Sequence, residues 1–135
     1  MQRRQKNSPK GDNNMSNING NVFSYIVEGD SIPARRIVKY GTSDDKRSLA
    51  TNATNLAGIT TDVGQSEAGQ RVDVQEDGEC LLQLGTAVSA GAWLTCGVGG
   101  RGVVAAAGQE VVARAKESGI SDEIIRVNIT RFVKL

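Results

Sequence analysis

The stretch from Gly58 to Gly108 constrains the fold more than any other part of this sequence. It consists of short apolar runs that are interrupted by glycine every few residues. Runs this short do not support long helices, but they fit strands joined by tight turns, in which glycine supplies backbone conformations that other residues avoid. We therefore expect an all-β fold: a small single-domain β-barrel or sandwich of about eight to ten short strands, with an extended N-terminal arm.

In this interpretation residues 1–20 form a flexible or extended arm and residues 21–135 form the β domain. The arm is too polar to offset the entropy that it would lose on ordering. The arm has four basic residues and one acidic residue. It either contacts nucleic acid or an acidic protein surface, or is a solvated tail. Ile18 is its only branched aliphatic residue and is the candidate anchor if the arm docks on a neighbour. Met15 is a second candidate start site.

The composition argues against most kinds of catalysis. The chain has no histidine to activate a serine or threonine, and its two cysteines cannot complete a zinc site without one. Two acidic groups, Asp44-Asp45 and the carboxylates of residues 73–79, lack the spacing of a calcium loop. We therefore expect no enzyme activity, no catalytic residue, no metal and no cofactor.

Charge and hydropathy limit the partners. The net charge of +1 provides no general attraction for nucleic acid, and 4% aromatic residues make a thin platform for stacking bases. No run of about 18 apolar residues is present, and the basic N-terminus lacks the apolar stretch of a signal peptide. We expect no membrane partner, no small-molecule substrate, and assembly in a cytoplasm. Cys80 and Cys96 should then be reduced, buried thiols.

The run Gly97-Val98-Gly99-Gly100-Arg101-Gly102 matches the pattern GxGxxG. A dinucleotide site would need a helix to begin at its end, yet only five residues, Val103 to Ala107, separate it from the next glycine. The run is therefore interpreted as a flexible hairpin tip.

Two places are candidates for protein contacts. The first strand, residues 21–28, is apolar on both faces, with Phe23, Tyr25 and Val27 on one and Val22 and Ile26 on the other. Either both faces are buried within the domain or one meets another subunit. Trp93 lies near a glycine-rich turn and is either an interface anchor or ordinary core filling.

Three further segments carry specific expectations. Residues 42–55 are interpreted as a polar surface loop. Residues 110–119 fit either a short helix or a strand. Residues 123–135 contain the clearest strand, and their alternation breaks around Arg131 and Phe132, which predicts a bulge or a departure from the sheet.

The order of these motifs resembles the head decoration proteins of tailed bacteriophages, also called capsid cement proteins. The resemblance covers about residues 21–130 and runs through YIVEGDSIPARRIVKYG, LAGITTDVG, AGQRVDVQEDGE, GTAVSAGAWLT, GRGVVAA and VVARAKESGISDEIIRVNI. This chain departs from the family at Ala92-Trp93, where many relatives have an acidic residue, and in its long basic arm.

The resemblance implies a structural role on the virion. Such proteins bind the outside of the expanded capsid, commonly as homotrimers, and stabilise contacts between major capsid protein subunits. It also implies a strand over residues 110–117. Ile18, Val22, Phe23, Tyr25 and Trp93 are then the expected interface residues, with the major capsid protein and other copies of this chain as partners. A virion or tail adaptor with a similar barrel, or a small ligand- or oligonucleotide-binding barrel, are the alternatives.

Overall fold

The computed structural model describes residues 20–61 and 65–135, and the predicted arm, including Ile18, lies outside the described residues. Ten strands and one short 3₁₀ turn make up the described part, which confirms the all-β prediction. The strands are β2 (Val22–Val27), β3 (Ile37–Tyr40), β4 (Lys46–Leu49), β5 (Leu56–Thr60), β6 (Arg71–Gln75), β7 (Gly78–Gln83), β8 (Trp93–Cys96), β9 (Gly102–Val104), β10 (Glu110–Ala115) and β11 (Ile124–Val133). The 3₁₀ turn is η1 (Val98–Gly100).

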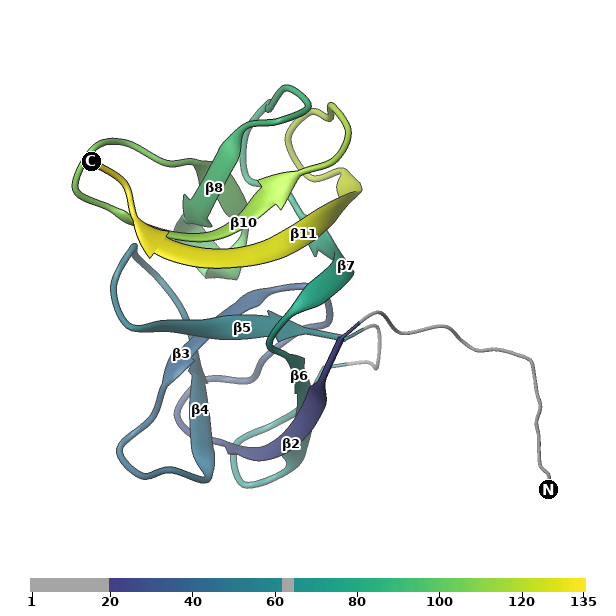
Figure 1. The fold of residues 1–135 in the computed structure, drawn as a ribbon. Helices are drawn as coiled ribbons and strands as arrows, with labels where there is room; N and C mark the ends of the chain where they lie inside the picture. Colours follow the sequence, from purple (N-terminus) through teal and green to yellow (C-terminus); the bar gives the residue numbers. More distant parts are fainter. Residues whose placement is uncertain (1–19, 62–64) are drawn as a thin grey trace, which may run out of the picture.

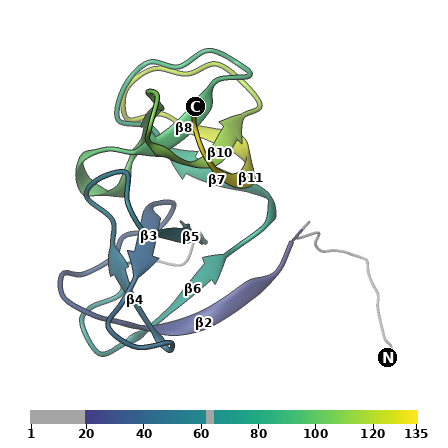
Figure 2. The same ribbon diagram turned by 60° about the vertical axis from the view of Figure 1, so that its left-hand side comes forward.

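The strands form two bodies, a closed barrel and an open sheet, stacked one on the other (Figures 1 and 2). The barrel has the order β2-β4-β3-β5-β6, and the pairing of β6 with β2 closes it. Only the β2–β4 pair is parallel among these barrel contacts. The sheet has the order β7-β11-β10-β8-β9, and its named pairs are all antiparallel. The predicted barrel is thus present, and a second five-stranded sheet is added to it.

Two apolar clusters hold these bodies together. The smaller one fills the barrel and contains Val27, Ile32, Val38, Ala57, Val72 and Val74. The larger one lies between the barrel and the sheet, because it joins residues of β3 and β5 to the inner face of the sheet. Its barrel members are Ile37, Ala50, Leu56 and Ile59. The junction between barrel and sheet is therefore itself a hydrophobic core, next to the smaller core inside the barrel.

Strand β5 supplies side chains to both clusters, and all five of its residues are buried. Its register against β3 slips by one residue: Val38 lies opposite Gly58, whereas Lys39 lies opposite Leu56, so Ala57 is the extra residue of a bulge. A bulge reverses the alternation of side chains along a strand. Leu56 and Ile59 consequently face the junction, while Ala57 packs inside the barrel.

The clearest predicted strand carries the predicted irregularity. The pairing of β10 with β11 shifts by one residue between Val111, which lies opposite Phe132, and Ala113, which lies opposite Ile129. The extra residue falls at Thr130 and Arg131, where the sequence alternation breaks. The ambiguous segment 110–119 contains strand β10, so the strand interpretation is confirmed and the helix is excluded.

The predicted loop at residues 42–55 differs from expectation because it contains β4. This strand reads Lys-Arg-Ser-Leu and has none of the apolar alternation that would identify it. One face of β4 carries Arg47 and Leu49, and Leu49 packs against the barrel cluster. An arginine therefore occupies a position on which an apolar residue would be expected.

Candidate interaction surfaces

The side chains of the first strand divide between two faces as the alternation predicts, with Phe23, Tyr25 and Val27 on the same face. Phe23 and Tyr25 lie opposite Val74 and Val72 of β6, which belong to the barrel cluster. Residues directly opposite in an antiparallel pair share a face, so Phe23 and Tyr25 belong to the inward face of β2 and not to its outer one. Tyr25 packs against the barrel cluster, whereas Phe23 remains 47% exposed. Val22 is half-buried on the opposite face.

The buried guanidinium of Arg47 packs against the ring of Tyr25. The guanidinium carbon of Arg47 lies 3.8 Å from the centre of the Tyr25 ring and 4.7 Å from that of Tyr40. Arg47 is only 6% exposed, donates Nη1 to the carbonyls of Asp44 and Lys46, and lies 3.9 Å from a carboxylate oxygen of Glu76. Such contacts offset the cost of removing a charge from water.

The Tyr25 hydroxyl completes this arrangement, because it donates to Glu76. Burial, followed by the hydrogen bond to the Glu76 carboxylate, raises the pKa of Tyr25 above its usual value. Tyr25 is therefore a structural residue of the barrel, and Phe23 is the residue of this pair whose ring is open to a partner.

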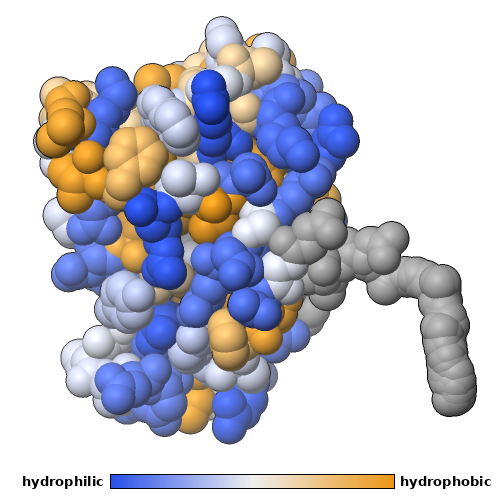
Figure 3. All heavy atoms as spheres, viewed as in Figure 1, coloured by the Kyte–Doolittle hydropathy of each residue, from blue (hydrophilic) through white to orange (hydrophobic). Residues whose placement is uncertain are grey.

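Trp93 belongs to an aromatic contact on the sheet. Its ring meets that of Phe132 edge to face, with the centroids 4.9 Å apart, and the guanidinium of Arg114 lies 4.6 Å from its centre. Trp93 is half-buried, and three apolar residues are exposed at or just after the end of β11: Phe132, which contacts Trp93, then Val133 and Leu135. We call these four residues the C-terminal patch. Figure 3 shows hydrophobic residues gathered at the upper left, where Figure 1 places the C-terminus.

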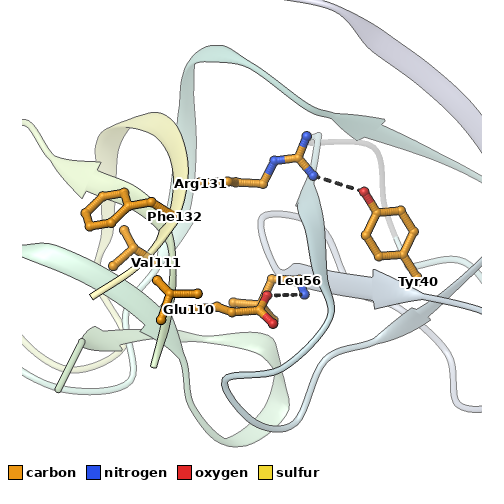
Figure 4. A pocket seen from close by; sticks show the side chains of 7 residues that line it. Tyr40, Leu56, Glu110, Val111, Arg131 and Phe132 are labelled. Atoms are coloured by element: carbon orange, nitrogen blue, oxygen red, sulfur yellow. Dashed lines mark hydrogen bonds between the residues drawn. The ribbon is translucent and has the colours of Figure 1, made fainter. Parts of the chain in front are cut away.

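A cleft of about 280 Å³ opens at the junction of the two bodies (Figure 4). Tyr40 and Leu56 of the barrel line one side, and residues 110–111 and 131–133 of the sheet line the other. Arg131 Nη1 lies 3.3 Å from both the Tyr40 hydroxyl and the Ala57 carbonyl, and donates to each.

The carboxylate of Glu110 also spans this junction. Its two oxygens accept hydrogen bonds from the amides of Asn55 and Leu56 at 2.9 and 3.0 Å. The charged groups of the cleft thus already have partners on the opposite body. The hydrogen bonds in the cleft connect the barrel to the sheet. These polar groups are therefore not free to bind a small ligand.

The residues named from the sequence do not form one site. Val22, Phe23 and Tyr25 belong to the barrel, Trp93 belongs to the sheet, and Ile18 lies outside the described residues. Sequence reasoning did not identify Phe132 as the partner of Trp93. The sequence marks Phe132 as unusual, because the alternation of the last strand breaks there. The break does not indicate which other aromatic ring Phe132 contacts.

Several carboxylates of the acidic group at residues 73–79 have structural partners. Asp77 accepts from the Asn21 amide at 2.6 Å, and Glu79 pairs with Lys116 at 2.9 Å. Residues 20–61 and 65–135 contain no group of three or more potential metal ligands. Within the same ranges, no helix is long and apolar enough to cross a membrane.

The two cysteines are free thiols. Cys96 is buried in the junction cluster, and Cys80 packs half-buried against it. Burial raises the pKa of each thiol to about 12, so both are protonated at neutral pH.

The glycine run from Gly97 to Gly102 joins β8 to β9, and a strand rather than a helix follows it. It is a hairpin connection, as predicted, but it is packed rather than free. A Cβ at Gly100 would lie 2.7 Å from Leu49 Cδ1 and 2.8 Å from the Ile37 carbonyl oxygen, and one at Gly102 would lie 2.6 Å from Leu82 Cδ2. The run closes the junction between sheet and barrel.

Comparisons with known proteins give a likeness of fold. No protein-family model matches the chain, and no curated protein matches it in sequence. Among solved structures, it is similar to the N-terminal base of the head fiber protein gp8.5 of bacteriophage phi29, with a TM-score of 0.64 and 21% identity. The match covers 84% of this chain and 96% of that one. The combination of barrel and sheet thus occurs in a phage head fiber base.

Proposed function

We propose that this chain is a structural protein of a phage virion that binds the outer surface of the expanded capsid and stabilises contacts between major capsid protein subunits. The observation that carries the proposal is the fold likeness to a head fiber base, which spans most of both chains. The motif order of residues 21–130 supports the same role independently, because it resembles that of head decoration proteins. In this proposal the protein has no catalytic function and works at the capsid exterior after assembly in the host cytoplasm.

The exposed apolar residues suit such a role. The C-terminal patch and Phe23 lie on different bodies of the molecule, so one copy presents two separated contacts. Weak contacts of this kind gain strength when several are made at once. We propose that the protein sits on the shell as a homotrimer, in which one contact serves the neighbouring copy and another serves the capsid.

The arm is the third proposed contact. Residues 1–19 carry Arg3, Arg4, Lys6 and Lys10, and Ile18 is their candidate apolar anchor. Asn21, at the start of the described domain, is fixed by Asp77 through both its amide and its side chain. Removal of residues 1–19 therefore leaves the attachment point of the domain intact.

Sedimentation with empty shells of the parent phage, before and after expansion, tests this proposal when bound copies are counted. Saturable binding of many copies to expanded shells alone supports a cement protein. Loss of residues 1–19 should weaken this binding while cooperative melting is retained, and unchanged binding would remove the arm from the mechanism. Absence of binding to either shell would overturn the proposal.

A second candidate function is favoured by the comparison itself. The similar structure is the base of a head fiber, and we propose as the alternative that this chain is an adaptor for another virion component. Binding of only a few copies per particle would favour such an adaptor, at a vertex or the tail, over a cement protein.

A further inference from the structure

The β8–β9 connection brings two arginines from different bodies to one point. Arg36 precedes β3 of the barrel, and Arg101 follows η1 on the sheet side. A Cβ at Gly99 would lie 3.2 Å from Nη1 of Arg101 and 3.5 Å from Nη1 of Arg36, so both guanidinium groups lie against this glycine. Gly99 also has φ of +69°, which a side chain would strain. The backbone thus leaves room for the two cations.

These cations are incompletely compensated. Arg36 donates to Gln83 Oε1 and to the Gly99 carbonyl, both of which are neutral acceptors. Arg101 Nε lies 3.4 Å from Asp122 Oδ1 and forms an ion pair with it, although the geometry is not that of a hydrogen bond. Asp122 is itself 71% exposed in its side chain, so water weakens this pair.

Each guanidinium has five N–H donors, and the contacts of Arg36 are to two neutral oxygens while Arg101 has one ion pair. Burial and then the like charge of Arg101 lower the pKa of Arg36, which agrees with the two groups lying close together. Two neighbouring cations of this kind are stabilised by an added anion.

The surroundings indicate what kind of anion fits. Val98, at the tip of the same connection, is 82% exposed. Residues 21–135 hold twelve basic and fourteen acidic side chains, and the carboxylate of Asp122 lies beside Arg101. A long polyphosphate would extend over this carboxylate and be repelled by it, whereas a short segment with one or two carboxylates would extend over less of the surface.

We propose that Arg36, Arg101 and Val98 form a docking site for an acidic segment of a partner protein, in which one or two carboxylates bind the guanidinium groups and an apolar neighbour covers Val98. Planar guanidinium groups bind carboxylates through two parallel hydrogen bonds, which lysine cannot reproduce. This inference stands on local geometry and does not require the partner to be a capsid.

A titration of the full isotope-labelled chain with a ten-residue glutamate peptide tests the site by NMR. We expect saturable shifts of the Nε–H signals of Arg36 and Arg101 and of the Gly99 amide. Arg101→Gln should weaken binding at these signals at least about fivefold, the loss of one partly exposed charge pair. Arg101→Lys should restore only part of the affinity, because it returns the charge without the paired donors.

Arg71→Gln is the matched control, since it removes the same charge from an exposed position on the barrel. It should leave the titration unchanged, and unaltered melting temperatures would show that each variant is folded. Equal effects of Arg101→Gln and Arg71→Gln, or shifts confined to the N-terminal arm, would overturn the proposal. Tighter binding of a ten-residue thymidine oligonucleotide at the same signals would also overturn it, in favour of nucleic acid.

Discussion

The ring of Phe132 stands nearly perpendicular to that of Trp93, with an angle of 89° between their planes. An edge-to-face pair of this kind contributes about 1 kcal/mol beyond the burial of its surface. Trp93→Ala, Phe132→Ala and the double variant should therefore show a coupling free energy of about 1 kcal/mol in urea unfolding. Simple additivity of the two single variants would mean that the rings stabilise the sheet independently. As a control, the coupling free energy between Trp93→Ala and Phe132→Ala should be the same when the cycle is measured in a Val133→Ala background.

Arg47 should be among the most sensitive charged residues of the barrel. Arg47→Met removes the cation from between Tyr25 and Tyr40 and leaves the Tyr25–Glu76 pair without its positive neighbour. We expect a loss of about 3 kcal/mol in the free energy of unfolding, as for a broken buried ion pair. Chemical denaturation measures this loss. Arg71→Met, at an exposed position, should change stability by less than about 0.5 kcal/mol. Equal losses would mean that the stacking contributes nothing.

A comparison of Gly100→Ala with Gly108→Ala separates the cost of backbone strain from the cost of steric conflict. Both have positive φ, +76° and +87°, but a Cβ at Gly108 meets nothing within 4 Å, whereas one at Gly100 meets Leu49 and Ile37. Gly108→Ala should therefore cost only about 1–2 kcal/mol of left-handed strain. Gly100→Ala should cost at least about 2 kcal/mol more, since overpacking at the junction is added. Similar melting temperatures for the two variants would restore the interpretation of this run as a free hairpin tip.

The thiols should be unreactive in the folded protein. With pKa values of about 12, Cys80 and Cys96 carry roughly a thousandfold less thiolate at pH 8 than thiols with the ordinary value. Their alkylation by iodoacetamide should accordingly be slow in buffer and fast in denaturant, and the folded-state rate should rise as the pH approaches 12. Mass spectrometry of each cysteine measures both rates. Rapid labelling of either residue at pH 8 without denaturant would contradict its burial.

Sequence patterns predicted the elements whose polarity alternates. A strand within residues 123–135 was identified because one of its faces is apolar, and the bulge near Arg131 followed from the point where that pattern fails. Strand β4 could not be identified in this way, since its buried Arg47 is compensated by rings that come from β2 and β3. Only tertiary contacts make that position suitable for a charge.

The candidate contacts were predicted less well than the strands. An alternating pattern assigns residues to two faces, but it does not indicate which face lies inside a barrel, and so it could not show that Tyr25 packs inward. The Arg36–Arg101 pair depends on residues 65 positions apart that meet only when the sheet rests on the barrel. A contact between residues so far apart in the chain leaves no local pattern in a single sequence from which it could be predicted.

Strand β5 gives this small domain a mechanical property. Because its bulge sends Leu56 and Ile59 into the junction and Ala57 into the barrel, a force applied to the sheet is transmitted through β5 to the closed ring of strands below it. Separation of the two bodies would expose the junction cluster but would leave the cluster inside the barrel covered. A partner that pulls on the C-terminal strand would thus load the barrel through the residues that β5 contributes to the junction.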